Sequence, residues 1–199
     1  MNRGDSSRHK RHSIRLQSHD YSGKGPYFIT VCSKDRLCIL GEVASGVMIP
    51  NAAGRIVEAF WKELPLHFAE TEPDVMVIMP NHVHFIVHIK DKDRVTDVGA
   101  IHELPLQSRQ SSRNMLLPKI IGYFKMNSAK RINDQRGTPG IPVWQRNYYE
   151  RVIRNEDELT RAREYIINNP LKWDLDRENP VNISTGRGIS HIGECKGDS

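Results

Sequence analysis

Residues 75–89, VMVIMPNHVHFIVHI, consist of two apolar runs of strand length with Pro80 and Asn81 between them. Valine and isoleucine are favoured in β-strands, and a Pro/Asn break is typical of a turn. The stretch therefore predicts a β-hairpin, and we expect this hairpin near the middle of a sheet.

The second run carries three histidines, His82, His84 and His88. Side chains on a strand alternate between its two faces, so these imidazoles share one face. The other face is expected to belong to the core and comprises Val83, Phe85, Val87 and Ile89. Two imidazoles one residue apart could bind one transition-metal ion, but two solvated histidines would give the same pattern. This stretch by itself leaves both interpretations open.

The whole chain has 199 residues and a net charge of +5, with a pI of about 9.2. Its length fits one domain with extensions, and its charge mildly favours polyanionic partners. Three cysteines without a CxxC pair argue against a disulfide framework and a cysteine zinc site. Because no apolar run is long enough for a membrane span or a signal peptide, we expect a cytoplasmic, nucleoid-associated protein without a membrane partner.

Strands and loops are expected on both sides of the hairpin. Aromatic and β-branched residues predict a strand at 27–33 and an extended segment at 143–153. The segment 34–50 is expected to be a loop or a short hairpin. The polar segment 90–113 lacks periodicity and predicts a long loop, which is usually functional or mobile.

Apolar side chains at helical spacing predict three helices. Their expected ranges are 51–64, 117–132 and 154–169. Asn51, at the start of the first range, and Asn155, near the start of the last, are expected to cap the N-termini of these helices. Pro65 and Pro170 are expected to end the same two helices, because proline lacks the backbone donor that a helix interior needs.

The predicted order is strand, helix, strand, strand, helix, strand and a final helix. This order matches the split βαββαβ pattern, so the predicted fold class is α+β and ferredoxin-like, with an antiparallel sheet. Two helices are expected on one face of the sheet, and the final helix across the histidine face. A basic N-terminal arm (1–25) and a flexible tail (174–199) are expected to flank the domain at 26–173.

The final predicted helix carries Arg161, Tyr165 and Asn169 at intervals of four, which places them on one helix face. A tyrosine hydroxyl is a covalent nucleophile once activated, and a nearby guanidinium could favour the phenolate. An amide oxygen could ligate a metal. An ordinary helix tyrosine followed by a C-terminal cap would show the same spacing, so both interpretations stay open at this point.

Three motifs in this order, HVH after MPN, WQRNYYERVIRNEDEL and YIINNPLKW, resemble the HUH single-tyrosine transposases. The REP-associated branch is the nearer match, since its front end resembles RRHSIRLQSHDYSGKGPYFITVC here. The resemblance covers residues 11–173. It implies a ferredoxin-like nuclease that cleaves and rejoins single-stranded DNA beside a hairpin, such as a REP-like element or the end of an insertion sequence.

The resemblance also implies roles for single residues. His82 and His84 match the two histidine metal ligands, and Tyr165 matches the nucleophile. Asn169 matches the third ligand, a position at which many relatives have glutamine. The implied cofactor is a divalent cation, Mg²⁺ or Mn²⁺, and the implied intermediate is a 5′-phosphotyrosine with a free 3′-hydroxyl. Relatives occur as dimers and as monomers, so a homodimer and a monomer are both open.

Basic side chains are expected to contact the DNA backbone, because a Lys or Arg that neutralises a phosphate releases counterions. The expected contacts are Arg11, Arg15, Lys125, Arg146, Arg154 and Arg161. Tyr123, Tyr148 and Tyr149 are rival nucleophiles on chemistry alone. Tyr148 and Tyr149 have no amide one helical turn onward, and all three tyrosines are expected to pack in the protein or to stack on DNA.

Two other functions fit the same residues. A catalytically idle, domesticated module would bind hairpin DNA or RNA without cutting it. A metal-dependent hydrolase would use water and form no covalent protein–DNA adduct. RNA-binding sheets of this type place aromatic residues on the open face, whereas histidines are predicted there, which favours a metal-dependent enzyme.

Overall fold

The computed structural model describes residues 24–90, 116–176, 179–180 and 182. The predicted N-terminal arm, the predicted long loop and the predicted tail lie almost wholly outside these residues. Among the helices within them, none has the length and apolar character needed to cross a membrane.

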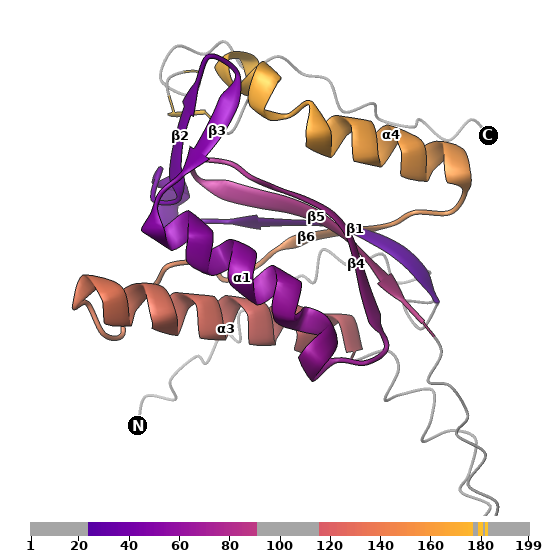
Figure 1. Cartoon of the computed structure of the whole chain (residues 1–199), viewed down its shortest axis with the longest axis horizontal. Helices are drawn as coiled ribbons and strands as arrows, with labels where there is room; N and C mark the ends of the chain where they lie inside the picture. Colours follow the sequence, from indigo (N-terminus) through magenta and orange to yellow (C-terminus); the bar gives the residue numbers. More distant parts are fainter. Residues whose placement is uncertain (1–23, 91–115, 177–178, 181, 183–199) are drawn as a thin grey trace, which may run out of the picture.

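Four antiparallel strands form the main sheet (Figure 1). In spatial order they are β4 (Thr71–Ile78), β5 (His82–Ile89), β1 (Gly25–Cys32) and β6 (Tyr149–Val152). The first and third strands of the βαββαβ repeat, β1 and β5, are therefore central. This order is the ferredoxin-like arrangement, and the predicted fold class and hairpin are confirmed.

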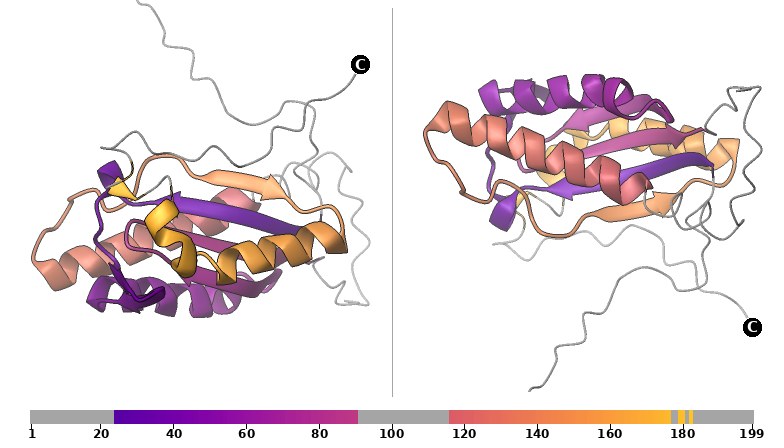
Figure 2. Two further views of the ribbon diagram at one scale, coloured as in Figure 1. Left: turned by 90° about the horizontal axis from the view of Figure 1, so that it is seen from above. Right: turned by 90° about the horizontal axis from the view of Figure 1, so that it is seen from below.

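Helices cover both faces of this sheet (Figures 1 and 2). Helices α1 (Ala52–His67) and α3 (Leu116–Arg136) pack side by side on one face, and α4 (Glu156–Ile167) lies on the other. The expectation that the final helix crosses the histidine face is thus confirmed.

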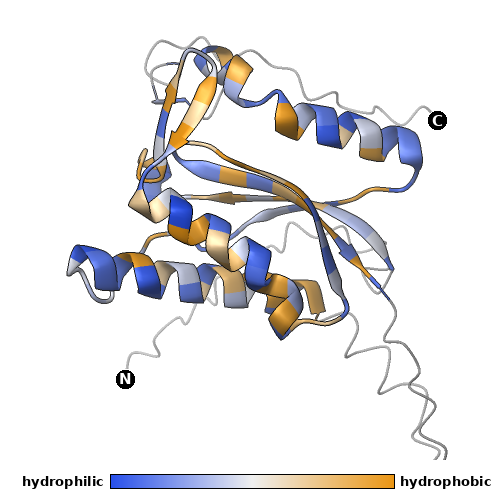
Figure 3. Cartoon of the chain, in the orientation of Figure 1, coloured by the Kyte–Doolittle hydropathy of each residue, from blue (hydrophilic) through white to orange (hydrophobic). Residues whose placement is uncertain are grey.

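Each face of the sheet has its own hydrophobic cluster, and side chains of β5 contribute to both. Val83, Phe85 and Val87 belong to the cluster beneath α1 and α3. Ile86 belongs to the smaller cluster beneath α4, where it meets Leu159 and Ile166. Figure 3 shows that apolar and polar residues also alternate along the helices. The period-two pattern in the sequence therefore places the even-numbered histidines of β5 on the α4 side.

The segment between β1 and α1 contains a short 3-10 helix, η1 (Lys34–Arg36), and a hairpin of β2 (Gly41–Ala44) and β3 (Val47–Pro50). The expected short hairpin is therefore present. Its turn needs glycine at Gly46, where φ is +74° and a Cβ would lie 2.7 Å from the side chain of Leu171. This close approach packs the hairpin against η2 (Pro170–Leu175), the 3-10 helix that follows α4.

Both predicted asparagine caps are confirmed. The side chain of Asn51 accepts from the backbone N–H groups of Ala53 and Gly54 at 2.9 and 3.1 Å. The side chain of Asn155 accepts from the N–H of Glu158 at 2.8 Å. These bonds satisfy donors that the first turn of a helix cannot pair internally.

The predicted helix ends are less accurate. Pro65 does not end α1, which continues to His67, because the next turn still closes through the N–H of Phe68 and the carbonyl of Leu64 at 2.9 Å. Helix α3 continues to Arg136, and its last turns are held by Asn133, whose amide donates to a carbonyl eight residues onward at 2.7 Å. Helix α4 ends at Ile167, two residues before its predicted end.

Candidate active site

His82 and His84 lie on the face of β5 that α4 covers, and both are buried, with exposed fractions of 0% and 5%. Their ring centroids are 4.5 Å apart. The prediction that they share a face turned away from α1 and α3 is confirmed. The alternative of two solvated histidines is wrong, because the rings are enclosed between the sheet and the segment that contains α4 and η2.

Hydrogen bonds determine which nitrogen of His82 carries the proton. The side-chain amide of Asn81 donates to the carbonyl of Arg36 at 3.1 Å, so its oxygen faces Nδ1 of His82, 2.8 Å away. A carboxamide oxygen only accepts, and therefore the proton lies on Nδ1 and Nε2 keeps its lone pair. Such an outer hydrogen bond is what orients a metal-binding histidine.

His84 has a similar support from the neighbouring strand. Its Nδ1 lies 2.8 Å from the hydroxyl of Thr30, which is its register partner on β1. A hydroxyl can accept as well as donate, so the same tautomer, with a free lone pair on Nε2, is available to His84.

Burial keeps both imidazoles neutral. Desolvation, with a smaller effect of the Arg36 charge, lowers the pKa of His82 to about 3. Desolvation and the neighbouring His82 hold the pKa of His84 well below its usual range. Neutral imidazole is the form that ligates metals, so both rings are in the binding-competent state at physiological pH.

Helix α4 brings Tyr165 to this pair. Its ring centroid lies 5.3 Å from that of His84 and 5.9 Å from that of Phe28 on β1. Tyr165 is 38% exposed, so a substrate can reach the side chain. Asn169 follows one helical turn later, just before η2, and is buried.

Three buried polar atoms of these residues have no hydrogen-bond partner: Nε2 of His82, Nε2 of His84 and Oδ1 of Asn169. An unpaired buried polar atom costs about 1–3 kcal/mol, so such atoms usually have a ligand or a function. All three atoms carry free lone pairs. The part of the chain described here has no group of three His, Cys, Asp or Glu that could hold a metal, so the amide oxygen of Asn169 would have to complete the set.

The basic residues predicted to contact DNA differ in position. Arg146, Arg154 and Arg161 are exposed. Arg11 and Arg15 lie outside the described residues. Contact of these five arginines with DNA stays a prediction.

Lys125 lies in a different environment. Its ammonium donates to the backbone carbonyls of Gln145, Arg146 and Asn147 at 2.6, 2.9 and 3.3 Å. Burial lowers the pKa of this ammonium. The three hydrogens of the ammonium thus hold the segment that leads into β6, a role that the helical spacing of lysines did not indicate. Its predicted contact with DNA is untested.

The rival tyrosines differ in their position relative to the histidines. Tyr148 is partly buried against the cluster beneath α1 and α3. Tyr123 packs on His67 and Phe68 with ring centroids 4.5 and 5.5 Å away. Tyr149 is 53% exposed on β6.

Sequence reasoning missed the residues that support the site. Asn81 was assigned only to the turn, although its place directly before His82 is a usable signal. Thr30 could be found only from the register of β1 with β5. His88 shares the histidine face as predicted, but its Nε2 contacts the carboxylate of Asp74 at 2.9 Å. No sequence pattern pointed to that pairing.

Two proteins of Haemophilus influenzae are similar to this chain in sequence. One, named "Uncharacterized protein", is 37% identical over 176 residues, which cover 85% of this chain and 93% of that protein. The other, named "Putative REP-associated tyrosine transposase", is 25% identical over 153 residues, which cover 77% of this chain and 74% of that protein. No protein-family model matches the chain.

Two solved structures are similar in shape. A REP-associated tyrosine transposase bound to a REP hairpin has a TM-score of 0.46 and 18% identity, with 88% of this chain and 90% of that chain covered. A transposase from Deinococcus radiodurans, assigned only provisionally, has a TM-score of 0.44 and 15% identity, with 77% of this chain and 97% of that chain covered.

Proposed function

We propose that this chain, which belongs to one family with the Haemophilus influenzae protein that is 37% identical to it, is a single-strand DNA endonuclease and strand transferase. The relationship of this chain to the REP-associated tyrosine transposases supports the proposal. Its proposed substrate is single-stranded DNA next to a hairpin. Tyr165 is the proposed nucleophile, and the cofactor is a divalent metal, Mg²⁺ or Mn²⁺.

The proposal rests mainly on the position of Tyr165 next to the histidine pair. A tyrosine ring 5.3 Å from His84 and partly open to solvent adjoins buried nitrogens that have no hydrogen-bond partner. Ordinary packing would not account for these unpaired nitrogens, since it would favour an apolar side chain at each histidine. Metal-dependent phosphoryl transfer to a tyrosine needs such an arrangement, in which a hydroxyl nucleophile lies beside side-chain atoms that are free to bind a metal.

His82, His84 and Asn169 would hold the metal through two nitrogens and one oxygen. A divalent cation bound there would polarise the scissile phosphate and stabilise its developing charge. Asn81 and Thr30 orient the two rings so that their free nitrogens stay available.

The reaction exchanges one phosphate ester for another. The phenol oxygen of Tyr165 forms a bond to phosphorus while the bond between phosphorus and the 3′ oxygen breaks. The phenol releases its proton, and the 3′ oxygen takes up a proton and leaves as a hydroxyl. The product is a 5′-phosphotyrosine, and because the ester bond is conserved, attack by a 3′-hydroxyl reverses the step and joins strands without ATP.

The test is covalent trapping. The full-length protein is incubated with a library of single-stranded hairpins and Mg²⁺ or Mn²⁺, and protein–DNA adducts are separated under denaturing conditions. We expect an adduct with the wild type and none with Tyr165→Phe, which loses only the hydroxyl. The matched control, Tyr148→Phe/Tyr149→Phe, should still form it.

Each other outcome identifies a different function. An adduct with Tyr165→Phe would contradict the assignment, and peptide mapping would find the true nucleophile. Cleavage without any adduct would indicate a hydrolase that uses water. Hairpin binding with neither cleavage nor adduct, with both metals, would indicate the catalytically idle binding module.

A further inference from the structure

We propose that Tyr149 is a stacking platform for an unpaired nucleobase of the DNA strand that reaches Tyr165. The proposal rests on the proposed function and adds a base-binding subsite to it. Its ligand is a nucleobase of single-stranded DNA.

A continuous row of aromatic rings leads from the histidines to Tyr149. Phe28 lies at the centre of this row, with ring centroids 5.4 Å from His84, 5.9 Å from Tyr165 and 6.4 Å from Tyr149. The contacts of Phe28 with both tyrosines are edge-to-face. An edge-to-face contact covers at most one face of a ring, so Phe28 supports the Tyr149 ring and leaves at least one of its faces uncovered by this contact.

Tyr149 lies on the open part of the sheet. It pairs with Thr30, so it shares the face of the histidines, and it is 53% exposed. Helix α4 packs mainly on β4 and β5, and Figure 2 shows β6 to one side of this helix. A strand of DNA could therefore lie along β6 beside α4 and extend to Tyr165.

The charge next to Tyr149 suits a nucleic-acid backbone. Arg151 follows two residues later on the same face of β6, and about half of its side chain is exposed. One of its nitrogens contacts Glu158 at 3.4 Å, which holds the guanidinium beside the strand. An open aromatic ring next to a cation is the combination with which proteins bind single strands, through stacking and phosphate contacts.

The structure separates Tyr149 from the other rival tyrosines. Its neighbour Tyr148 directly precedes β6 and is partly buried against the cluster beneath α1 and α3, and Tyr123 packs against His67 and Phe68. An unpaired base exposes both of its faces, whereas a base in a duplex is covered by its neighbours. The platform should therefore prefer single strands to duplex DNA.

The probe is a thymidine oligonucleotide of about 20 nucleotides in which some positions carry 5-iododeoxyuridine. This base crosslinks on irradiation to aromatic side chains stacked on it. The full-length protein is used in the presence of EDTA, so that no cleavage can take place. We expect a crosslink that peptide mapping assigns to Tyr149.

Binding affinity gives the second measurement. Tyr149→Leu should weaken binding of this oligonucleotide roughly 5- to 100-fold and remove the crosslink, while the thermal midpoint stays close to that of the wild type. Tyr149→Phe should bind the oligonucleotide about as tightly as the wild type, because the aromatic ring is retained. Tyr148→Phe, one residue away and partly buried against the cluster beneath α1 and α3, is the matched control and should bind as the wild type does.

Failure of this proposal is distinguishable from failure of the proposed function, because the binding test does not depend on Tyr165. A crosslink to another residue, wild-type affinity in Tyr149→Leu, or no binding of the oligonucleotide by the wild type would each overturn the platform. The covalent adduct with cleavable hairpins would still decide whether the chain is a transferase.

Discussion

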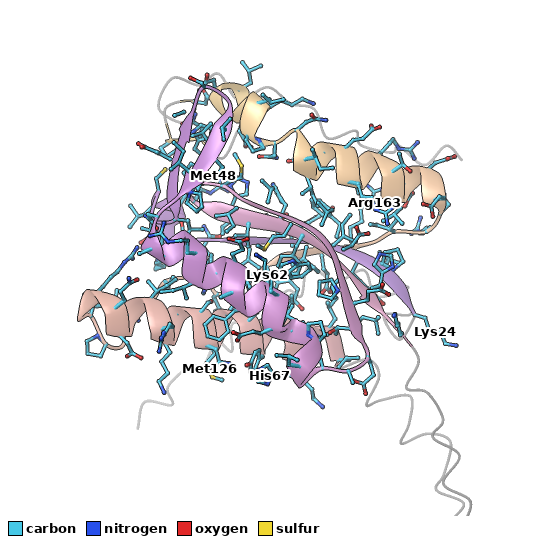
Figure 4. All side chains as sticks on the ribbon, viewed as in Figure 1. Lys24, Met48, Lys62, His67, Met126 and Arg163 are labelled. Carbon is cyan, nitrogen blue, oxygen red and sulfur yellow. The ribbon has the colours of Figure 1, made fainter. Side chains whose placement is uncertain are left out.

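Arg163 of α4 donates to the carboxylate of Asp74 on β4 through two nitrogens, with Nε 3.2 and 3.0 Å from the two oxygens and Nη2 2.8 Å from Oδ2. Figure 4 labels Arg163 between its helix and the sheet. His88 contacts the same carboxylate from β5. Since Arg163 lies two residues before Tyr165, this polar cluster attaches the helix with the proposed nucleophile to the sheet.

Replacement of Asp74 by asparagine should destabilise the protein at neutral pH by about 1–3 kcal/mol, because it removes the charged acceptor from a partly buried pair. Urea unfolding of wild type and Asp74→Asn measures the difference in the free energy of unfolding. Glu58→Gln is the control, since it removes an exposed pair with Lys62 on α1 and should cost less than about 0.5 kcal/mol.

The effect of Asp74→Asn should depend on pH. Burial alone would raise the pKa of Asp74, but the hydrogen bonds from Arg163 and His88 outweigh it and hold the pKa below its usual range. A lowered folded-state pKa stabilises the protein fully above the unfolded-state pKa, and this stabilisation disappears as pH falls through the folded-state pKa. The difference between wild type and variant should therefore shrink below about pH 4. A constant difference down to strongly acidic pH would contradict the role of the carboxylate.

Metal affinity should depend on the residues that orient the histidines as well as on the histidines. His82→Ala/His84→Ala should abolish Mn²⁺ binding measured by calorimetry without unfolding the domain. Asn81→Ala should weaken binding about 10- to 100-fold, because Nε2 of His82 is then no longer held free of a proton.

The third histidine of the strand provides the matched control. His88→Ala removes a neighbouring imidazole that contacts Asp74 instead, so Mn²⁺ affinity should stay unchanged. The same affinity in wild type and the double histidine variant would exclude the proposed site.

The topology could be predicted from the sequence because each element has its own hydrophobic period. The alternation in β5 fixed which side chains face α1 and α3, and Asn51 and Asn155 marked two helix starts. The Arg163–Asp74 pair could not be found in this way. Asp74 lies where the pairing of β4 with β5 is irregular, and such a bulge changes the direction of a side chain in a way that a strict period of two does not predict.

The residues proposed to react and to bind a metal could be named from the sequence, whereas the residues that orient the histidines could not. His82, Tyr165 and Asn169 carry side chains whose chemistry is evident from residue type and spacing. Thr30 is an ordinary strand residue, and its role depends on the register between β1 and β5, which the chain acquires only on folding. The burial that keeps the imidazoles neutral likewise arises from the packing of α4 and is not a local property of the strand.

Lys125→Met should affect stability more than DNA binding. The ammonium of Lys125 already donates to three carbonyls, so its removal should lower the free energy of unfolding by about 1–3 kcal/mol. We expect the salt dependence of affinity for single-stranded DNA to be unchanged. Deletion of residues 1–25, which include Arg11 and Arg15, should reduce that dependence, by about 0.7 in the log–log slope for each phosphate that the arm neutralises. A reduced slope in Lys125→Met would instead support its predicted DNA contact.

Asn169 provides the sharpest test of the metal site, because stability and affinity should change in different ways. Its Oδ1 is buried without a hydrogen-bond partner, so the folded protein without metal gains nothing from this oxygen. Asn169→Ala should therefore leave the metal-free unfolding transition close to that of the wild type. If the oxygen is the third ligand, the same variant should bind Mn²⁺ more weakly and lose the stabilisation that Mn²⁺ gives to the wild type.

Asn169→Gln tests the length of the ligand in the same assay. Glutamine keeps the amide and adds one methylene, so the variant should bind Mn²⁺ more tightly than Asn169→Ala. Thermal unfolding with and without Mn²⁺ measures both variants beside the wild type. An unchanged Mn²⁺-induced shift in Asn169→Ala would remove Asn169 from the ligand set and leave the two histidines as the metal ligands of this chain.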